Sequence, residues 1–290
     1  MIDGIITKGI GGFYYVKTDE VIYECRARGK FRKEQITPLV GDKVKITIDS
    51  STKQGVIEEI IKRDTEFIRP PVANVNQAII VFAVKKPDPN LVLLDRFLVM
   101  AENEDVDVVV CFNKIDLDEK YLLELKKIYT CAGYPVVSTS VKNKIGIDTF
   151  KDILRDKITV FAGPSGVGKS SLLNETQPNL ALKTGEISEK NKRGKHTTRH
   201  VELLELDFGG WVLDTPGFSS LNLDFIEEDQ LQFLFREFVP YIGSCKFSGC
   251  KHLNEPKCAI KEAVLHNTIN KSRYESYIQL LKEINQKRRY

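Results

Sequence analysis

The segment Gly163-Pro164-Ser165-Gly166-Val167-Gly168-Lys169-Ser170 decides the fold of this chain of 290 residues. It matches the phosphate-loop pattern, a glycine, four intervening residues and then Gly-Lys-Ser, at every fixed position. An apolar run typical of a buried strand, Lys157–Ala162, precedes it, and a helix is expected to follow. Such a loop directs backbone N–H groups and a helix N-terminus at phosphates. We therefore predict a nucleotide-binding α/β domain in which Lys169 meets the β- and γ-phosphates and Ser170 binds Mg²⁺.

A second motif, Asn113-Lys114-Ile115-Asp116, selects the nucleotide. It follows a predicted apolar strand, Val106–Phe112, at the edge where ligands bind in parallel sheets. The Asp116 carboxylate accepts two hydrogen bonds from guanine that adenine cannot donate, and an unpaired buried carboxylate is costly. We expect the asparagine to contact the base edge and the lysine stem to pack along the ring. Ser140-Val141-Lys142 is either a base-contacting loop or a plain connection.

Two further segments supply the expected contacts to Mg²⁺ and the γ-phosphate. Asp214-Thr215-Pro216-Gly217 follows a short apolar strand, so its Asp is expected in the metal shell and its Gly N–H near the γ-phosphate. The polar segment Lys192–Arg199 contains two threonines, of which Thr198 is favoured over Thr197 as a Mg²⁺ ligand. The nucleotide contacts expected from all these motifs are Asn113, Lys114, Asp116, Ser140, Val141, Gly163, Pro164, Ser165, Gly166, Val167, Gly168, Lys169, Ser170, Ser171, Thr197, Thr198, Asp214 and Gly217.

The group that orients the attacking water is not given by these motifs. Many GTPases place a glutamine directly after Asp-x-x-Gly, and this chain has Phe218 there, which cannot hydrogen-bond to water. His196, beside the threonines, is the nearest polar candidate. It either positions the water or is a surface histidine that contacts RNA. With Lys169 and Thr198 it forms the expected catalytic set, and slow intrinsic hydrolysis is expected.

The motifs resemble those of translational GTPases in a rotated order, with the guanine motif before the phosphate loop. Cutting the common fold before the strand at Val75–Val84 reproduces every element expected in residues 67–222, so we predict a circularly permuted α/β GTPase domain. The other elements expected there are helices at Asp88–Glu104, Glu119–Ala132 and Asp148–Arg155, a strand at Tyr134–Ser138 and a hairpin of Val201–Phe208 with Trp211–Leu213.

The first 66 residues predict a small β-barrel. Five short runs rich in Val, Ile and Tyr are separated by turns, which is typical of a five-stranded oligonucleotide-binding (OB) barrel. The loop Arg26–Lys33 holds five basic residues, no acid and one aromatic. It is either a site that grips phosphates and stacks on a base or a solvated connection. The predicted strands are Ile2–Thr7, Gly12–Lys17, Val21–Arg28, Asp42–Asp49 and Gly55–Ile61.

Residues 223–290 predict a mostly helical zinc-binding domain. Cys245, Cys250, His252 and Cys258 have the spacing C-x4-C-x-H-x5-C, and three thiolates with one imidazole suit one structural Zn²⁺. So small an apolar segment is expected to need the metal to fold. Residues 245–290 carry ten Lys and Arg against four Asp and Glu, which suits a polyanion such as RNA. Helices are expected at Glu227–Val239 and Lys271–Gln286.

The barrel, the permuted GTPase and the Cys3His segment together resemble the RsgA family, the circularly permuted GTPases that depend on the small ribosomal subunit. The resemblance covers essentially the whole chain, and the family's histidine before the switch threonines matches His196. It implies hydrolysis of GTP to GDP and phosphate with Mg²⁺, stimulation by the small subunit, and a role in late maturation of that particle. In this motif order the Asp-Thr-Pro-Gly segment runs directly into the metal-binding domain through Phe218–Asp224. We therefore also expect the nucleotide state to control binding to rRNA and release from it.

Bulk features agree with a cytoplasmic protein. There is no run of about 18 apolar residues and no signal peptide at the N-terminus, and clustered cysteines are typical of a reducing compartment. We expect a monomer that does not bind membranes. Two alternatives stay open from the residues alone. Phe218 leaves room for an RNA-binding scaffold that binds GTP without turnover, and a preference for ATP would instead indicate a small-molecule kinase.

Overall fold

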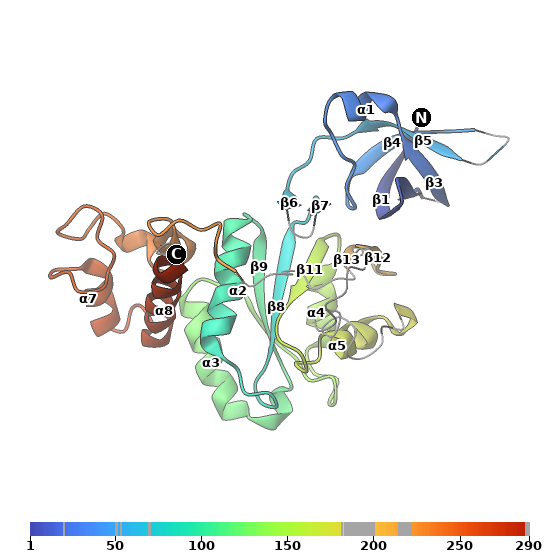
Figure 1. Cartoon of the computed structure of the whole chain (residues 1–290). Helices are drawn as coiled ribbons and strands as arrows, with labels where there is room; N and C mark the ends of the chain where they lie inside the picture. Colours follow the sequence, from blue (N-terminus) through green and yellow to red (C-terminus); the bar gives the residue numbers. More distant parts are fainter. Residues whose placement is uncertain are drawn as a thin grey trace.

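The computed structural model describes residues 1–19, 21–49, 52, 54–68, 71–180, 182, 201–213 and 222–287. A closed five-stranded barrel precedes a six-stranded sheet with helices on both faces, and a largely helical segment follows (Figure 1). The predicted fold class is therefore confirmed. In the described part of the chain, no helix has the length and apolar character needed to cross a membrane.

The barrel closes through two pairings between strands distant in sequence. β1 pairs with β4 in antiparallel fashion, and β3 pairs with β5 in parallel. Side chains such as Ile6, Val16 and Ile46 alternate inward and are fully buried. The basic loop predicted between the third and fourth strands contains a short helix, α1 (Gly29–Lys33). The strands are β1 (Ile2–Ile10), β2 (Phe13–Lys17), β3 (Ile22–Ala27), β4 (Lys43–Ile48) and β5 (Gly55–Ile60).

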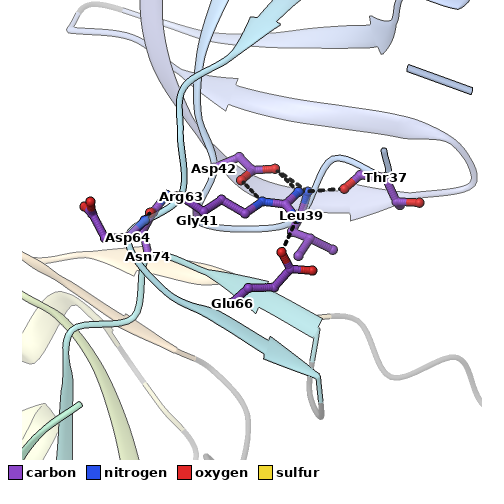
Figure 2. Close-up of polar contacts among 8 residues, drawn as sticks. All are labelled: Thr37, Leu39, Gly41, Asp42, Arg63, Asp64, Glu66 and Asn74. Carbon is purple, nitrogen blue, oxygen red and sulfur yellow. Dashed lines mark hydrogen bonds and ion pairs between the residues drawn. The ribbon is translucent and has the colours of Figure 1, made fainter. Parts of the chain in front are cut away.

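A hairpin that the sequence did not indicate, β6 (Glu66–Ile68) with β7 (Pro71–Ala73), joins the barrel to the sheet. Figure 2 shows the polar contacts that hold this joint. Arg63 donates from Nε to Asp42 Oδ1 at 2.7 Å and from Nη2 to Asp42 Oδ2 at 2.8 Å. Asn74 Nδ2 donates to the Gly41 carbonyl at 2.9 Å. Because the Asp42 side chain is fully buried, its pairing with arginine ties the barrel to the connecting segment.

The central sheet has the strand order β10-β9-β8-β11-β13-β12. The first five of these strands are parallel, and only the β12–β13 pair is antiparallel. The strands are β8 (Gln77–Ala83), β9 (Asp107–Asn113), β10 (Val136–Ser138), β11 (Ile158–Ala162), β12 (Leu203–Glu205) and β13 (Trp211–Leu213). The helices between them are α2 (Leu91–Asn103), α3 (Glu119–Cys131), α4 (Ile147–Leu154) and α5 (Lys169–Thr176), with 3₁₀ turns η1 (Ile115–Leu117) and η2 (Pro178–Leu180).

Alternate residues of β8 belong to two separate hydrophobic clusters. Ile80 and Phe82 lie in the cluster that includes α2 and α3, whereas Ile79 and Val81 lie in the cluster that includes α4 and α5. The strand is buried on both faces because successive side chains of a strand point to opposite sides. This explains why the run read as continuously apolar in the sequence.

The C-terminal part differs from the prediction at one helix. Residues 227–239 do not form a continuous helix but two 3₁₀ turns, η3 (Leu231–Leu234) and η4 (Val239–Tyr241). Phe235 breaks the helix with an extended backbone (φ −108°, ψ 99°), and it packs on Phe238 at 5.1 Å and on Tyr277 at 5.4 Å between ring centroids. Burial of both phenylalanines overrides the local helical pattern. The second predicted helix is confirmed as α8 (Lys271–Lys287), and α7 (Ala259–Leu265) was not predicted.

The helix α8 packs against α2 (Figure 1). A buried ion network fixes this contact. Arg273 of α8 is fully buried and donates from Nη1 to Asp95 Oδ1 of α2 at 2.6 Å and from Nε to Glu237 Oε1 at 2.6 Å. Tyr129 of α3 also donates to Asp95 Oδ1, at 3.0 Å. The network joins four segments distant in sequence, so the C-terminal part and the α2–α3 face form one packed unit.

We expect Arg273→Met to lower the free energy of unfolding by about 3 kcal/mol, because it leaves two buried carboxylates without their cation. Urea unfolding measures the change. Lys271→Met is the matched control on the same helix, since it removes an exposed ion pair with Glu275 and should change stability by less than about 0.5 kcal/mol. Equal effects of the two substitutions would contradict the structural role given to Arg273.

Candidate nucleotide site and metal centre

The phosphate loop connects β11 to α5 at the centre of the sheet, as the sequence predicted. Two of its glycines are required by close contacts, one with a backbone carbonyl and one with a side-chain amide. A Cβ at Gly163 (φ 135°) would lie 2.0 Å from the Val81 carbonyl oxygen, and one at Gly168 (φ 98°) would lie 2.4 Å from Asn113 Nδ2. The loop can therefore pack against β8 and the Asn113 side chain only because no side chain intervenes.

Lys169 lies at the start of α5 and is 6% exposed. Its Nζ donates to the carbonyl oxygens of Gly163 and Pro164, both at 2.8 Å. Burial lowers the pKa of this ammonium to about 8. The Lys169 ammonium is thus held inside the loop. An anion bound there would neutralise its positive charge, which the surrounding protein groups do not neutralise.

Asn113 links the guanine motif to the phosphate loop. Its Nδ2 donates to the Val167 carbonyl at 2.9 Å, and its Oδ1 accepts from Thr139 Oγ1 at 3.1 Å. The side chain is 2% exposed, and its amide holds the loop. The expected contact of Asn113 with the base edge stays a prediction. Thr139, fully buried beside it, was missed by sequence reasoning, although it directly precedes the predicted loop at Ser140. It acts as a support for Asn113.

Lys114 and Asp116 flank the expected position of the base. The Lys114 backbone is left-handed (φ 58°), and its Nζ donates to the Gly166 carbonyl at 2.6 Å. Ser140, which is fully buried, donates from Oγ to Asp116 Oδ1 at 2.6 Å. Ser140 Oγ also accepts from the Asn143 N–H at 3.2 Å. The structure thus brings the guanine motif, the Ser140 loop and the phosphate loop to one edge of the sheet.

We expect Asp116→Asn to weaken GTP binding by about 100-fold or more, because the amide cannot accept both hydrogen bonds from guanine. Titration with GTP and with xanthosine triphosphate, whose 2-oxo group suits an amide donor, measures the change. Asp118→Asn serves as a control two residues away, since Asp118 caps α3 by accepting from the Tyr121 N–H. Unchanged GTP affinity in the Asp116 variant would remove this residue from base recognition.

The expected Mg²⁺ and γ-phosphate contacts, Thr197, Thr198, Asp214 and Gly217, lie outside the described residues, as do His196 and Phe218. The described residues on either side of residues 183–200 are anchored to α5 and to the residue that follows it. Asn174 Nδ2 donates to the Leu182 carbonyl at 2.7 Å, and Asn174 Oδ1 accepts from the Leu182 N–H at 3.0 Å. On the other side, Gln177 Oε1 accepts from the Asp207 N–H at 2.8 Å.

The predicted zinc ligands come together. The four ligand atoms of Cys245, Cys250, His252 and Cys258 lie within 4.8 Å of one another. The Sγ atoms of Cys245 and Cys258 are 3.8 Å apart, which equals the roughly 3.8 Å spacing of sulfurs at Zn–S distances of about 2.3 Å in a tetrahedron. His252 Nδ1 lies 3.3 Å from Cys258 Sγ. This donor set fits a closed structural Zn²⁺ site.

Neighbouring groups orient the ligands. His252 Nε2 lies 2.9 Å from Gln232 Oε1, while Gln232 Nε2 donates to the Asp229 carbonyl at 3.0 Å. The glutamine oxygen therefore accepts from Nε2–H, which leaves His252 Nδ1 free to bind metal. Tyr274 of α8 donates to the His252 carbonyl at 2.6 Å. Burial raises the pKa of the Cys250 and Cys258 thiols, so thiolates here need a compensating cation.

The barrel carries a basic pocket of about 670 Å³ between the β1–β2 turn and α1. Arg26, Arg28 and Arg32 line it, and the Arg26 guanidinium lies 4.6 Å from the centre of the Phe13 ring. Phe31, the aromatic of the predicted basic loop, is 4% exposed and belongs to the core, so it is not available to stack on a base. Phe13 and Tyr14 line this pocket and are both partly exposed aromatics.

Family models match nearly all of the barrel and the sheet. The model described as the RsgA N-terminal domain matches residues 3–57, and the one described as the RsgA GTPase matches residues 60–224. A protein of Alkaliphilus metalliredigens named small ribosomal subunit biogenesis GTPase RsgA is 53% identical over 292 residues, with 100% of both chains covered. One of the same name from Clostridium novyi is 52% identical, covering 98% of this chain and 97% of the relative.

Two solved structures share the fold over almost their full length. The crystal structure of YjeQ from Thermotoga maritima has a TM-score of 0.85 and 39% identity, with 98% of each chain covered. The crystal structure of YloQ, described as a circularly permuted GTPase, has a TM-score of 0.81 and 42% identity, covering 99% of this chain and 96% of the other. Both similarities extend through the C-terminal segment that holds the Cys3His cluster.

Proposed function

This chain belongs to the RsgA family of GTPases, and from that premise we propose that it binds the small ribosomal subunit and acts in its late maturation. The observation that carries the proposal is the 53% identity to a protein named small ribosomal subunit biogenesis GTPase RsgA over 100% of both chains. The matched region spans the barrel and the C-terminal segment with the metal centre as well as the GTPase domain. The similarity therefore extends over the whole chain rather than over the GTPase domain alone. This supports the proposal that the chain binds the same partner as the relative.

In this proposal GTP lies across the edge formed by the phosphate loop and the guanine motif. Asp116, held by Ser140, accepts from guanine, and the Lys114 stem lies along the ring. The loop Gly163–Ser170 and the adjacent Ser171 wrap the phosphates, with Val141 at the base. When bound, Mg²⁺ neutralises phosphate charge, and Ser170 and Thr198 would hold it with Asp214 nearby. The Gly217 N–H and Thr197 complete the contacts proposed near the γ-phosphate.

His196 is proposed to orient the attacking water, because Phe218 cannot. We expect His196→Ala to lower subunit-stimulated turnover by about 100-fold while leaving the affinity for GDP unchanged, since the imidazole acts only on the water. Single-turnover hydrolysis with saturating small subunits measures this. His266→Ala, in a described exposed histidine after α7, is the matched control. Undiminished stimulated turnover of the His196 variant would remove this residue from the mechanism.

The two flanking units, residues 1–66 and 223–290 around a GTPase unit at 67–222, are proposed to contact rRNA. The arginine-lined pocket beside Phe13 supports binding of single-stranded RNA by the barrel. Zn²⁺ held by the four ligands would fix the shape of the C-terminal unit. Leu223 and Ile226, six and nine residues after Gly217, are 2% and 1% exposed and belong to the hydrophobic cluster that includes residues of α8. This attachment supports control of RNA binding by the nucleotide state.

The test is GTP hydrolysis by the full, zinc-loaded chain with and without purified small ribosomal subunits. Stimulation by small subunits, and none by large subunits, is expected. Binding of the GTP-analogue and GDP forms to small subunits is then compared, and the GTP-analogue form is expected to bind more tightly. Equal affinity of the two forms would contradict nucleotide control, and absence of stimulation would contradict the proposed partner. A monomer in the cytoplasm is the proposed working state.

A further inference from the structure

The zinc loop, residues 245–250, carries an exposed aromatic side chain. Phe247 lies two residues after Cys245 and three before Cys250, and it is 44% exposed. Phe235 and Phe238 of the same unit are instead fully buried. Figure 1 shows the chain before α7 as loops on the side of α8 away from the central sheet. The Phe247 ring is therefore open to a partner.

Two lysines accompany this ring. Lys246 Nζ lies 5.4 Å from the centre of the Phe247 ring. The Lys246 N–H donates to the Lys257 carbonyl at 3.2 Å, so the residues next to the first and the last zinc ligand lie side by side. Both lysines are exposed, and neither forms an ion pair with another described residue, whereas Lys251 pairs with Glu228. The charges of Lys246 and Lys257 are therefore available beside an exposed ring.

The surface around the ring suits a polyanion that also has apolar faces. Residues 245–258 carry three lysines and one glutamate, a net charge of +2. The carboxylate of that glutamate, Glu255, is occupied by backbone donors, since Oε1 accepts from the Lys251 N–H and Oε2 from the Leu253 N–H, both at 2.8 Å. Unpaired RNA offers both phosphates and open base faces, whereas a duplex covers the faces of its bases. The combination of ring and lysines therefore favours single-stranded RNA.

We propose that the zinc loop binds an unpaired nucleotide of RNA. Phe247 stacks on the base, and Lys246 and Lys257 contact the adjoining phosphates. The metal ligands Cys245 and Cys250 hold both ends of the loop, so the ring has little freedom to lose on binding. This deepens, and rests on, the proposed contact of residues 223–290 with rRNA. It gives that contact a preference for single-stranded segments over duplex.

The test measures binding of the full, zinc-loaded chain to a labelled oligouridine of about eight nucleotides and to a labelled blunt-ended RNA duplex, by fluorescence anisotropy. The chain carries Phe13→Leu with Arg26→Gln throughout, so that the barrel pocket contributes little. Phe247→Leu keeps an apolar side chain without an aromatic face. It is expected to bind the single strand about ten-fold more weakly and the duplex unchanged. Phe247→Trp is expected to bind the strand at least as tightly as the parent chain.

The two lysines are tested through the salt dependence of binding. Lys246→Gln with Lys257→Gln is expected to reduce the slope of log affinity against log salt by about 1.4, because about 0.7 is lost for each phosphate contact to a single strand. Phe247→Leu is expected to leave that slope unchanged, since the ring carries no charge. An unchanged slope in the double lysine variant would contradict the proposed phosphate contacts.

Phe233→Leu is the matched control, because Phe233 is 54% exposed in η3 of the same unit and lies outside the zinc loop. It is expected to leave the affinity for the strand unchanged, and every variant is expected to keep stoichiometric zinc. Unchanged strand affinity of Phe247→Leu, an equal loss for strand and duplex, or weak binding by Phe247→Trp would each overturn the inference.

A protein partner for the ring gives a different result. Phe247→Leu would then bind whole small ribosomal subunits more weakly without any loss of affinity for the RNA strand, and this outcome would also overturn the inference. No ribosomal subunit enters the oligonucleotide measurement. Failure of the stacking contact is therefore distinguishable from failure of the proposed partner.

Discussion

Replacement of Lys169 by alanine is expected to lower kcat/KM for GTP by about 10³-fold. The ammonium is 6% exposed and is pointed into the loop by the carbonyl groups of Gly163 and Pro164. Solvent therefore cannot replace its charge beside the phosphates when the side chain is removed. Multiple-turnover hydrolysis, without and with small subunits, measures the loss in the intrinsic and in the stimulated reaction.

The same lysine predicts a pH dependence. Burial lowers the pKa of the free Lys169 ammonium to about 8, whereas phosphates next to it favour the charged form. Binding of GTP therefore takes up a proton above that pH, and affinity falls as the pH rises beyond about 8. The alanine variant should lack this dependence. Lys157→Ala, which removes an exposed lysine paired with Asp107, is the control. A Lys169→Ala enzyme that retains wild-type turnover would exclude the proposed phosphate site.

Removal of zinc is expected to unfold the C-terminal segment. Structural zinc contributes an apparent free energy of about 10–16 kcal/mol in small zinc-binding peptides, far more than a single buried side chain. Cys258→Ala, in a residue 2% exposed at the start of α7, should therefore abolish stoichiometric zinc and expose residues 223–287 to protease. Zinc content and limited proteolysis of the full chain are the measurements.

A cysteine outside the cluster separates loss of the metal from loss of a thiol. Cys131 lies exposed at the end of α3, and Cys131→Ala is expected to keep zinc and protease resistance. Chelator treatment of the wild-type chain should reproduce the Cys258 result. A C-terminal segment that stays protease-resistant without zinc would show that the buried contacts of Arg273 and Phe235 suffice to fold it.

Short-range patterns determined much of the molecule. The phosphate loop, the guanine motif and the Cys3His spacing each place their chemistry within a few adjacent residues, so the sequence alone predicts them. The barrel followed from short strand-like runs separated by turns. The permuted sheet followed from longer apolar runs, because a strand buried on both faces, such as β8, is apolar at every position after its first residue, Gln77. Family resemblance rested on the order of the same motifs.

The tertiary structure decided what depends on residues distant in the chain. Asn113 serves the phosphate loop because Val167, 54 positions later, needs a donor for its carbonyl oxygen. The predicted helix at 227–239 does not form, because Phe235 and Phe238 are buried more favourably when the chain turns between them. The contact of Lys8 with Glu202 spans 194 positions. Such pairings are set by the packing of whole domains, which no local pattern encodes.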